Sequence, residues 1–274
     1  MRRRCWLILM DFMLLAATGV VGASPDPPIL RLATTTSTDN TGLLDHILPV
    51  FEKATGARVH VIAVGTGKAL KLGENGDVDV LLVHDPELEA QFLHYGYGLY
   101  RRPVMYNDFI IAGAAADPAR IRGSATAADA FRKMGGGAAR FVSRGDESGT
   151  HQMEKRLWQQ AGITPAGRWY VEAGQGMGPV LLMADSLQAY VLTDRASYLK
   201  LKNKLSLAIL FEGDPALFNQ YSVIPVNPAR HPGIRGGLAE RFARWLAEPA
   251  TQALIGNFGR SEFGVSLFLP NATP

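Results

Sequence analysis

Val78-Asp79-Val80-Leu81-Leu82-Val83 is a nearly continuous apolar run, typical of a parallel strand that is buried on both faces. Two further strands are predicted before it, at residues 29–33 and 58–64. Between them, apolar residues recur at helical spacing from about residue 40 to 55, and a second helix begins at residues 69–72. This β-α-β-α-β order predicts a parallel sheet with right-handed crossovers.

The rest of the chain alternates in the same way, so the sequence predicts an α/β protein throughout. Further strands are expected at residues 109–113, 140–142, 169–171, 189–192 and 222–226. Further helices are expected at residues 125–134, 152–161, 179–184, 235–246 and 251–258. The elements form two clusters, with crossings expected near residues 106–108 and 225–227. We therefore expect one lobe of residues 24–106 plus 227–274 and a second lobe of residues 107–226.

Residues 1–23 have the layout of a signal peptide: arginines, then an apolar run, then small residues that end at Ala23. The alternative is a transmembrane anchor, which the short run, interrupted by Asp11, disfavours. Cleavage would remove three arginines and one aspartate, which lowers the net charge of +3 to +1. A nearly neutral mature chain argues against a nucleic-acid partner. The single cysteine, Cys5, also leaves, so stability must come from core packing and not from disulfides.

Three polar segments share one plan, in which a strand ends, hydroxyls and glycines follow, and a helix begins. They are residues 34–38 (TTTST), 65–68 (GTGK) and 143–150 (SRGDESGT). The first backbone N–H groups of a helix have no partner within the helix and lie at its positive end. Glycine lets the backbone approach a ligand, and hydroxyls donate further hydrogen bonds, so such segments favour an oxyanion. The alternative for each segment alone is a plain helix N-cap.

Hydrolase and metal chemistry have weaker support in the sequence. Ser148 lies outside a G-x-S-x-G turn, and His151 three residues later cannot be assumed to face it. A secreted serine hydrolase that uses Ser148 is therefore the alternative from another functional class. The six histidines show no paired ligand spacing, so no metal site and no cofactor are expected.

Several motifs together resemble those of the periplasmic tungstate-binding proteins of ABC transporters. The motifs are TTTS at 34–37 followed by GLL at 42–44, VGTGKAL at 64–70, GDVDVLLVHD at 76–85, VMYNDF at 104–109, SRGDESGTH at 143–151 and residues 221–228. The match covers nearly the whole mature chain in the expected order. The R-x-D-x-S-G-T core alone is less specific, because phosphate-binding proteins are similar there.

The resemblance implies a type II periplasmic-binding-protein fold, with two α/β lobes, a hinge and one oxyanion in the cleft. It also implies a monomer that is exported to the periplasm, binds tungstate, presents it to a membrane permease and catalyses no reaction. Carried over by position, the ligand contacts are Thr35, Thr36, Ser37, Thr66, Arg144, Ser148, Gly149 and Thr150.

The identity of the anion depends on hydrogen-bond chemistry. Tungstate and molybdate are fully deprotonated near neutral pH, so a site made only of donors suits them. Phosphate usually carries a proton, so its site needs an acceptor. Asp146 is either that acceptor or the partner that holds Arg144 in place. A molybdate or phosphate receptor of the same fold therefore remains the alternative.

Overall fold

The computed structural model describes residues 26–137 and 139–273. The predicted signal peptide and Cys5 lie outside the described residues. Within the described ranges, every helix is too short or too polar to cross a membrane.

Three parallel strands form the start of the main sheet. β1 (Ile29–Thr35) lies between β2 (Arg58–Val64) and β3 (Val80–Val83) and is parallel to both. The connections are α2 (Leu43–Thr55) and α3 (Thr66–Asn75), and both end at a glycine with a left-handed backbone, Gly56 and Gly76. The predicted β-α-β-α-β unit is confirmed, and the residues of β3 are all buried.

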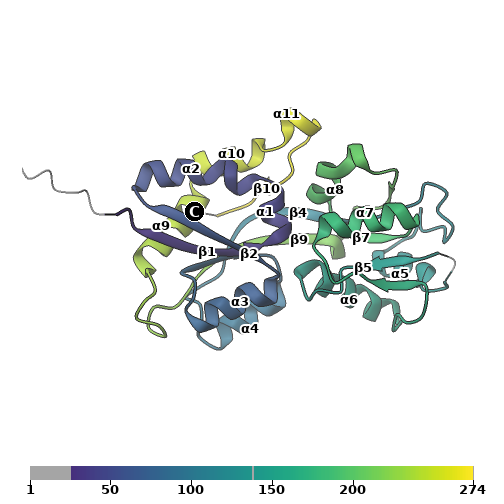
Figure 1. Cartoon of the computed structure of the whole chain (residues 1–274), viewed down its shortest axis with the longest axis horizontal. Helices are drawn as coiled ribbons and strands as arrows, with labels where there is room; N and C mark the ends of the chain where they lie inside the picture. The colour runs from purple at the N-terminus through teal and green to yellow at the C-terminus, as the bar shows by residue number, and fades with distance from the viewer. Residues whose placement is uncertain (1–25, 138, 274) are drawn as a thin grey trace, which may run out of the picture.

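Two antiparallel strands join this sheet to the rest of the molecule. β4 (Arg102–Gly113) pairs through residues 102–108 with β9 (Phe218–Pro225), which also pairs with β3. The far half of β4 pairs instead with β7 (Val191–Asp194) and β8 (Ala208–Phe211). β4 and β9 therefore run between the two masses of the molecule (Figure 1).

The second mass contains a separate sheet and a set of helices. β5 (Phe141–Ser143) and β6 (Tyr170–Glu172) pair in parallel. Around them lie α5 (Ala127–Met134), α6 (Gly149–Ala161), α7 (Met177–Leu187), α8 (Arg195–Leu201) and short 3-10 turns at Lys202–Lys204 and Pro215–Leu217. Phe131, Phe141 and Trp158 pack against one another in its core in tilted and edge-to-face arrangements, with ring centroids 4.5 to 5.7 Å apart.

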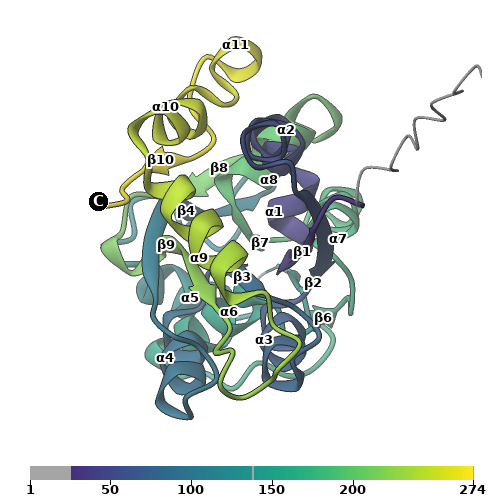
Figure 2. The ribbon, with the colours of Figure 1, turned by 90° about the vertical axis from the view of Figure 1, so that its left-hand side faces the viewer.

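The C-terminal segment returns to the first mass. α9 (Gly236–Ala247), α10 (Pro249–Asn257) and α11 (Arg260–Phe263) lead to β10 (Leu269–Pro270), which pairs with β4. α9 and α10 cover the same face of the sheet as α2, whereas α3 and α4 (Pro86–His94) cover the other (Figures 1 and 2). Chain segments from both termini thus build one core.

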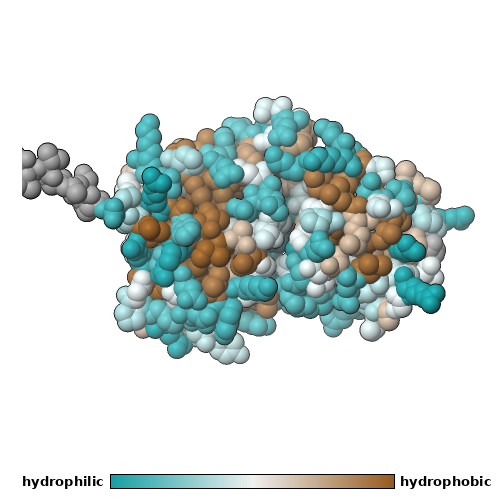
Figure 3. Space-filling model, in the orientation of Figure 1, coloured by the Kyte–Doolittle hydropathy of each residue, from teal (hydrophilic) through white to brown (hydrophobic). Residues whose placement is uncertain are grey.

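The buried apolar side chains separate along the same division. Two clusters contain residues 30–105 and 221–268, with Ala196 as an added member, and two contain residues 109–217. The surface is mostly polar, with an apolar strip on the left-hand mass in Figure 3. β2 is an edge strand there, and its side chains Val59, Val61 and Ile62 are only partly buried.

Some local predictions are wrong. Residues 34–38, expected as a polar loop between a strand and a helix, belong to both elements: Thr34 and Thr35 end β1, and α1 (Thr36–Asn40) follows directly. Residues 66–68 are already helical, because Gly65 and not a later residue is the N-cap of α3. The structure also adds α4, α8 and β8, which the hydrophobic pattern did not indicate.

Candidate anion-binding site

The N-terminal ends of α3 and α6, from the two masses of the molecule, meet each other. A Cβ atom built on Gly149 would lie 2.9 Å from Cε1 of His84 and 3.1 Å from Oγ1 of Thr66. A Cβ atom built on Gly65 would lie 3.7 Å from Cα of Ser148. Gly149 thus has no room for a side chain, and the GTGK and SRGDESGTH segments adjoin each other.

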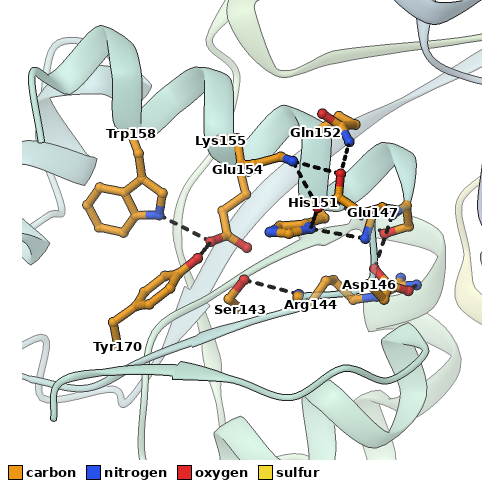
Figure 4. Close-up of polar contacts among 12 residues, drawn as sticks. Ser143, Arg144, Asp146, Glu147, His151, Gln152, Glu154, Lys155, Trp158 and Tyr170 are labelled. Carbon is orange, nitrogen blue, oxygen red and sulfur yellow. Dashed lines mark hydrogen bonds and ion pairs between the residues drawn. The ribbon is translucent and has the colours of Figure 1, made fainter. Parts of the chain in front are cut away.

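Arg144 is almost completely buried beside this contact, at 1% exposure. Its Nη2 donates to Oδ2 of Asp146 at 2.5 Å, and Oδ1 of Asp146 accepts the backbone N–H of Ser148 at 3.2 Å (Figure 4). Both oxygens of Asp146 are therefore in use, which favours its role as the holder of Arg144 over that of a phosphate acceptor. Nε and Nη1 of Arg144 are buried and have no hydrogen-bond partner among the described residues.

Two threonine hydroxyls lie in the first turns of the facing helices. Thr66 begins α3, Thr150 follows Gly149 in α6, and both are buried. Neither Oγ1 atom has a hydrogen-bond partner in the part of the chain that the structure describes. Because an unpaired buried hydroxyl is costly, these two atoms are candidates for contact with a ligand.

The TTTS segment is more occupied than the sequence indicates. Thr35 is the N-cap of α1, and its Oγ1 accepts the backbone N–H of Thr38 at 3.3 Å. The same oxygen lies 3.1 Å from Oγ of Ser37 and 2.6 Å from Oγ1 of Thr38. Thr35 and Ser37 are buried, whereas Thr36 is half-buried. Thr35 is thus an N-cap, as the alternative interpretation expected. Its hydroxyl forms a hydrogen-bonded cluster with the hydroxyls of Ser37 and Thr38.

A polar network behind the site was missed from the sequence. Nδ1 of His84, at the end of β3, lies 2.9 Å from Oδ1 of Asn219, and Nδ2 of Asn219 donates to Oδ1 of Asn107 at 2.7 Å. The ring of Tyr221 stacks on His84 at a centroid distance of 4.7 Å. Burial lowers the pKa of His84 to about 4, so its ring is neutral and Nδ1 donates. The strands β4 and β9 carry Asn107, Asn219 and Tyr221. Polar side chains within otherwise apolar strands were the feature of the sequence that could have indicated this network.

Glu154 supports the SRGDESGTH segment from α6 and was also missed. Its Oε1 accepts from Nε1 of Trp158 at 3.2 Å and from the hydroxyl of Tyr170 at 2.8 Å (Figure 4). Burial raises the pKa of Glu154 to about 7, while hydrogen bonds from Tyr170, the Ser143 hydroxyl and the Arg144 backbone N–H oppose that shift. The carboxyl group therefore ties α6 to Tyr170 on β6, the strand that pairs with β5 directly before Arg144.

Ser148 and His151 are not arranged as a nucleophile and its base. Oγ of Ser148 is the N-cap acceptor of α6 and receives the backbone N–H of His151 at 3.3 Å. Nδ1 of the His151 ring lies 3.1 Å from the backbone nitrogen of Glu147, which donates to it. Burial lowers the pKa of His151. No group of three or more metal-ligating side chains occurs within residues 26–137 and 139–273.

Comparisons with known proteins place the chain in a family. The family model described as the PBP superfamily domain matches residues 22–250. The tungstate-binding protein TupA of Peptoclostridium acidaminophilum is 49% identical over 243 residues, which are 88% of this chain and 85% of that protein. The solved structure of the tungstate-binding protein TupA from Desulfovibrio alaskensis G20 is 52% identical, with a TM-score of 0.77, and covers 90% of this chain and 100% of its own.

A second solved structure, titled as the tungstate ABC transporter from Geobacter sulfurreducens, is 49% identical, with a TM-score of 0.76. It covers 84% of this chain and 98% of its own. These likenesses confirm the predicted α/β two-lobe, type II binding-protein fold. The chain belongs to the PBP superfamily and, within it, to the family of the TupA tungstate-binding proteins.

Proposed function

We propose that this chain is an extracytoplasmic substrate-binding protein that captures tungstate and delivers it to the permease of an ABC transporter. The observation that carries the proposal is the set of buried donors without partners among the described residues, on Arg144, Thr66 and Thr150. They come from two lobes and face one another across Gly149. Relatives at 49% and 52% identity are named as tungstate-binding proteins, which supports the choice of anion.

The proposed ligand contacts are the eight residues predicted from the sequence. Arg144 supplies the formal positive charge, and the Thr66, Thr150 and Ser37 hydroxyls supply neutral donors. The backbone N–H groups at Gly149 and the N-terminal ends of α3 and α6 add their partial positive charge. Ser148, Thr35 and Thr36 complete the list. Ser148 accepts a backbone N–H group as an N-cap, so its own hydroxyl hydrogen is available to the ligand. The Thr35 hydroxyl also lies within hydrogen-bond distance of the Ser37 and Thr38 hydroxyls, so it would contact the ligand as part of that cluster.

Capture would proceed by closure of the two lobes on the anion, with donors from both sides stabilising the closed state. The proposed lobes are residues 24–106 plus 227–274 and residues 107–226, joined by β4 and β9. Tyr221 and Val223 pack into a cluster of the first lobe, which supports a second crossing nearer residues 218–220 than 225–227.

The remaining features of the proposal follow from this role. The chain is exported by a cleavable leader of residues 1–23 and acts as a monomer. It catalyses no reaction and has no nucleic-acid partner. Molybdate, which has the same charge and shape, is the expected second ligand. The geometry of Ser148 and His151 gives the hydrolase alternative no support, and the occupied oxygens of Asp146 weaken the phosphate alternative.

Thermal unfolding in the presence of different anions tests the choice of ligand. A ligand at about one hundred times its Kd raises the free energy of unfolding by about 2.7 kcal/mol. We expect tungstate to raise the melting temperature, molybdate to raise it to a comparable or smaller extent, and sulfate and phosphate to leave it unchanged. A shift with phosphate and none with tungstate would contradict the proposal.

A further inference from the structure

One buried carboxylate oxygen, like the donors of the site, has no hydrogen-bond partner among the described residues. Asp194 ends β7 and is the N-cap of α8, where Oδ1 accepts the backbone N–H of Ser197 at 2.8 Å. Its residue exposure is 1%, and Oδ2 has no hydrogen-bond partner among the described residues. Within residues 26–137 and 139–273, the other buried side-chain atoms without a hydrogen-bond partner belong to groups that can donate; Oδ2 of Asp194 is the carboxylate oxygen among them.

The surroundings of Asp194 connect it to the anion site. The charge of Arg144 acts on Asp194, and Asp194 in turn raises the pKa of the Tyr221 hydroxyl. Asp194 is opposite Phe109 on β4, whose ring centroid lies 6.4 Å from that of His84. Burial raises the pKa of Asp194, against hydrogen bonds from Ser197 and the charge of Arg144, which lower it. The carboxyl group is thus already biased toward its neutral form.

Charge balance makes an ionised Asp194 incompatible with a bound dianion. The charge of Arg144 is already paired with Asp146. An ionised Asp194 would add a further negative charge to a buried site that receives two more from the ligand, and like charges in such a site raise the pKa strongly. A proton on Oδ2 removes that charge and turns an unpaired acceptor into a hydrogen-bond donor.

We propose that Asp194 is a further binding residue of the anion site and meets the bound dianion as the neutral acid, so that capture takes up one proton. The proton passes from solvent to Oδ2, and no bond to the anion is made or broken. A hollow of about 250 Å³ is lined in part by Thr41, Ser197 and Lys200, so it reaches the residue of α8 whose backbone N–H Asp194 accepts. This inference rests on the proposed capture of tungstate.

The sign of the pH dependence follows from linkage. Binding the dianion raises the pKa of Asp194 above its value in the free protein. Between those two values, the affinity for tungstate falls by up to about tenfold for each unit that the pH rises, and it is constant outside them. Tungstate is fully deprotonated near neutral pH, so a proton that is taken up on binding goes to the protein.

The other titratable groups near Asp194 have to be distinguished from it as sites of proton uptake. His84 is neutral above a pKa of about 4, and the pKa of Tyr221 is raised well above its ordinary value. Lys200, on the same helix, lies 3.6 Å from Glu262. His151 and Glu154 lie on α6 behind the site; burial lowers the pKa of His151 and raises that of Glu154 to about 7. Glu154 is therefore the group whose titration the test must separate from that of Asp194.

Titration calorimetry of tungstate in buffers of different ionisation enthalpy counts the protons taken up. Measured over a series of pH values, the wild-type chain should take up close to one proton over part of the range. Asp194→Asn keeps the N-cap acceptor and cannot ionise. It should take up none and bind tungstate with an affinity that does not fall over that range. Asp194→Ser, which also caps, repeats the test if the first variant does not fold.

Glu154→Gln decides which carboxyl group takes up the proton. Uptake that persists in Glu154→Gln and disappears in Asp194→Asn supports the proposal. Uptake that persists in Asp194→Asn overturns it, as does tungstate binding by the wild type with no uptake at any pH. A wild-type chain that binds no tungstate at all overturns the proposed function together with this inference, so the two failures are distinguishable.

Discussion

At the scale of single residues, Arg144 divides its donors between two tasks. Nη2 is held by Asp146, while Nε and Nη1 are buried without partners among the described residues. The residue types predicted this chemistry, because hydroxyls, glycines and arginine before a helix favour an oxyanion. His84, Glu154 and Asp194 could not be assigned in the same way, because their importance depends on burial and on neighbours from distant strands. The local sequence contains neither.

The two unpartnered threonine hydroxyls give a prediction at this scale. Thr66→Val and Thr150→Val each remove a hydroxyl that has no hydrogen-bond partner within the described chain, so the stability of the unliganded protein should stay the same or rise. The affinity for tungstate should fall by about 1.5 to 3 kcal/mol for each, as expected for a hydrogen bond to a charged group. Chemical unfolding and titration calorimetry measure the two quantities.

Thr34→Val is the matched control. Thr34 is equally buried, but its Oγ1 donates to the carbonyl oxygen of Leu82 at 2.8 Å. This variant should lose about 1 kcal/mol of stability, the net worth of one hydrogen bond. If Thr66→Val and Thr150→Val lose stability to the same extent and keep their affinity, the two hydroxyls do not bind the anion.

At the scale of elements, helices that begin directly after strands carry the site. The strand β3 and the helices α2 and α3 were predictable from a buried apolar run and from helical spacing. α4 and α8 were not predictable from apolar periodicity, although Asp85-Pro86 and Asp194 are N-cap signals. The full length of β4 was missed for another reason: its first half is held by β9, more than one hundred residues later in the chain.

The contact between α3 and α6 predicts a strong effect of one methyl group. Gly149→Ala would put Cβ within 2.9 Å of His84 and 3.1 Å of Thr66, and His84 cannot move away freely because Asn219 and Tyr221 hold it. Overpacking of this kind costs about 1 to 3 kcal/mol. We expect the affinity for tungstate to fall by about 5- to 150-fold in a calorimetric titration, because the lobes cannot close completely.

Gly237→Ala controls for the substitution itself. Gly237 lies in the first turn of α9, where an added Cβ would meet nothing within 4 Å. Alanine is the better helix former, so this variant should be at least as stable as the wild type and bind tungstate equally well. Equal affinity in Gly149→Ala and Gly237→Ala would mean that the contact across Gly149 does not belong to the ligand-bound state.

At the scale of the whole molecule, two separately packed lobes share two strands. The chain crosses from one lobe to the other along β4 and β9, and its C-terminal helices return to the first core. The alternation of elements and the return of the tail were predictable from the sequence. The residues at which the chain crosses between the lobes were harder to predict, because a strand that packs against two cores shows no break in its apolar pattern. The arrangement lets a small anion be enclosed by donors from both lobes.

The central claim is that this enclosed site binds one tungstate through Arg144, and a calorimetric titration of tungstate into the wild type and Arg144→Ala tests it most directly. We predict one tungstate per wild-type chain. In Arg144→Ala the loss of charge-assisted hydrogen bonds should weaken binding by about 2 to 3 kcal/mol, or roughly 30- to 150-fold. A wild-type chain without saturable binding, or equal affinity in the two proteins, would contradict the account.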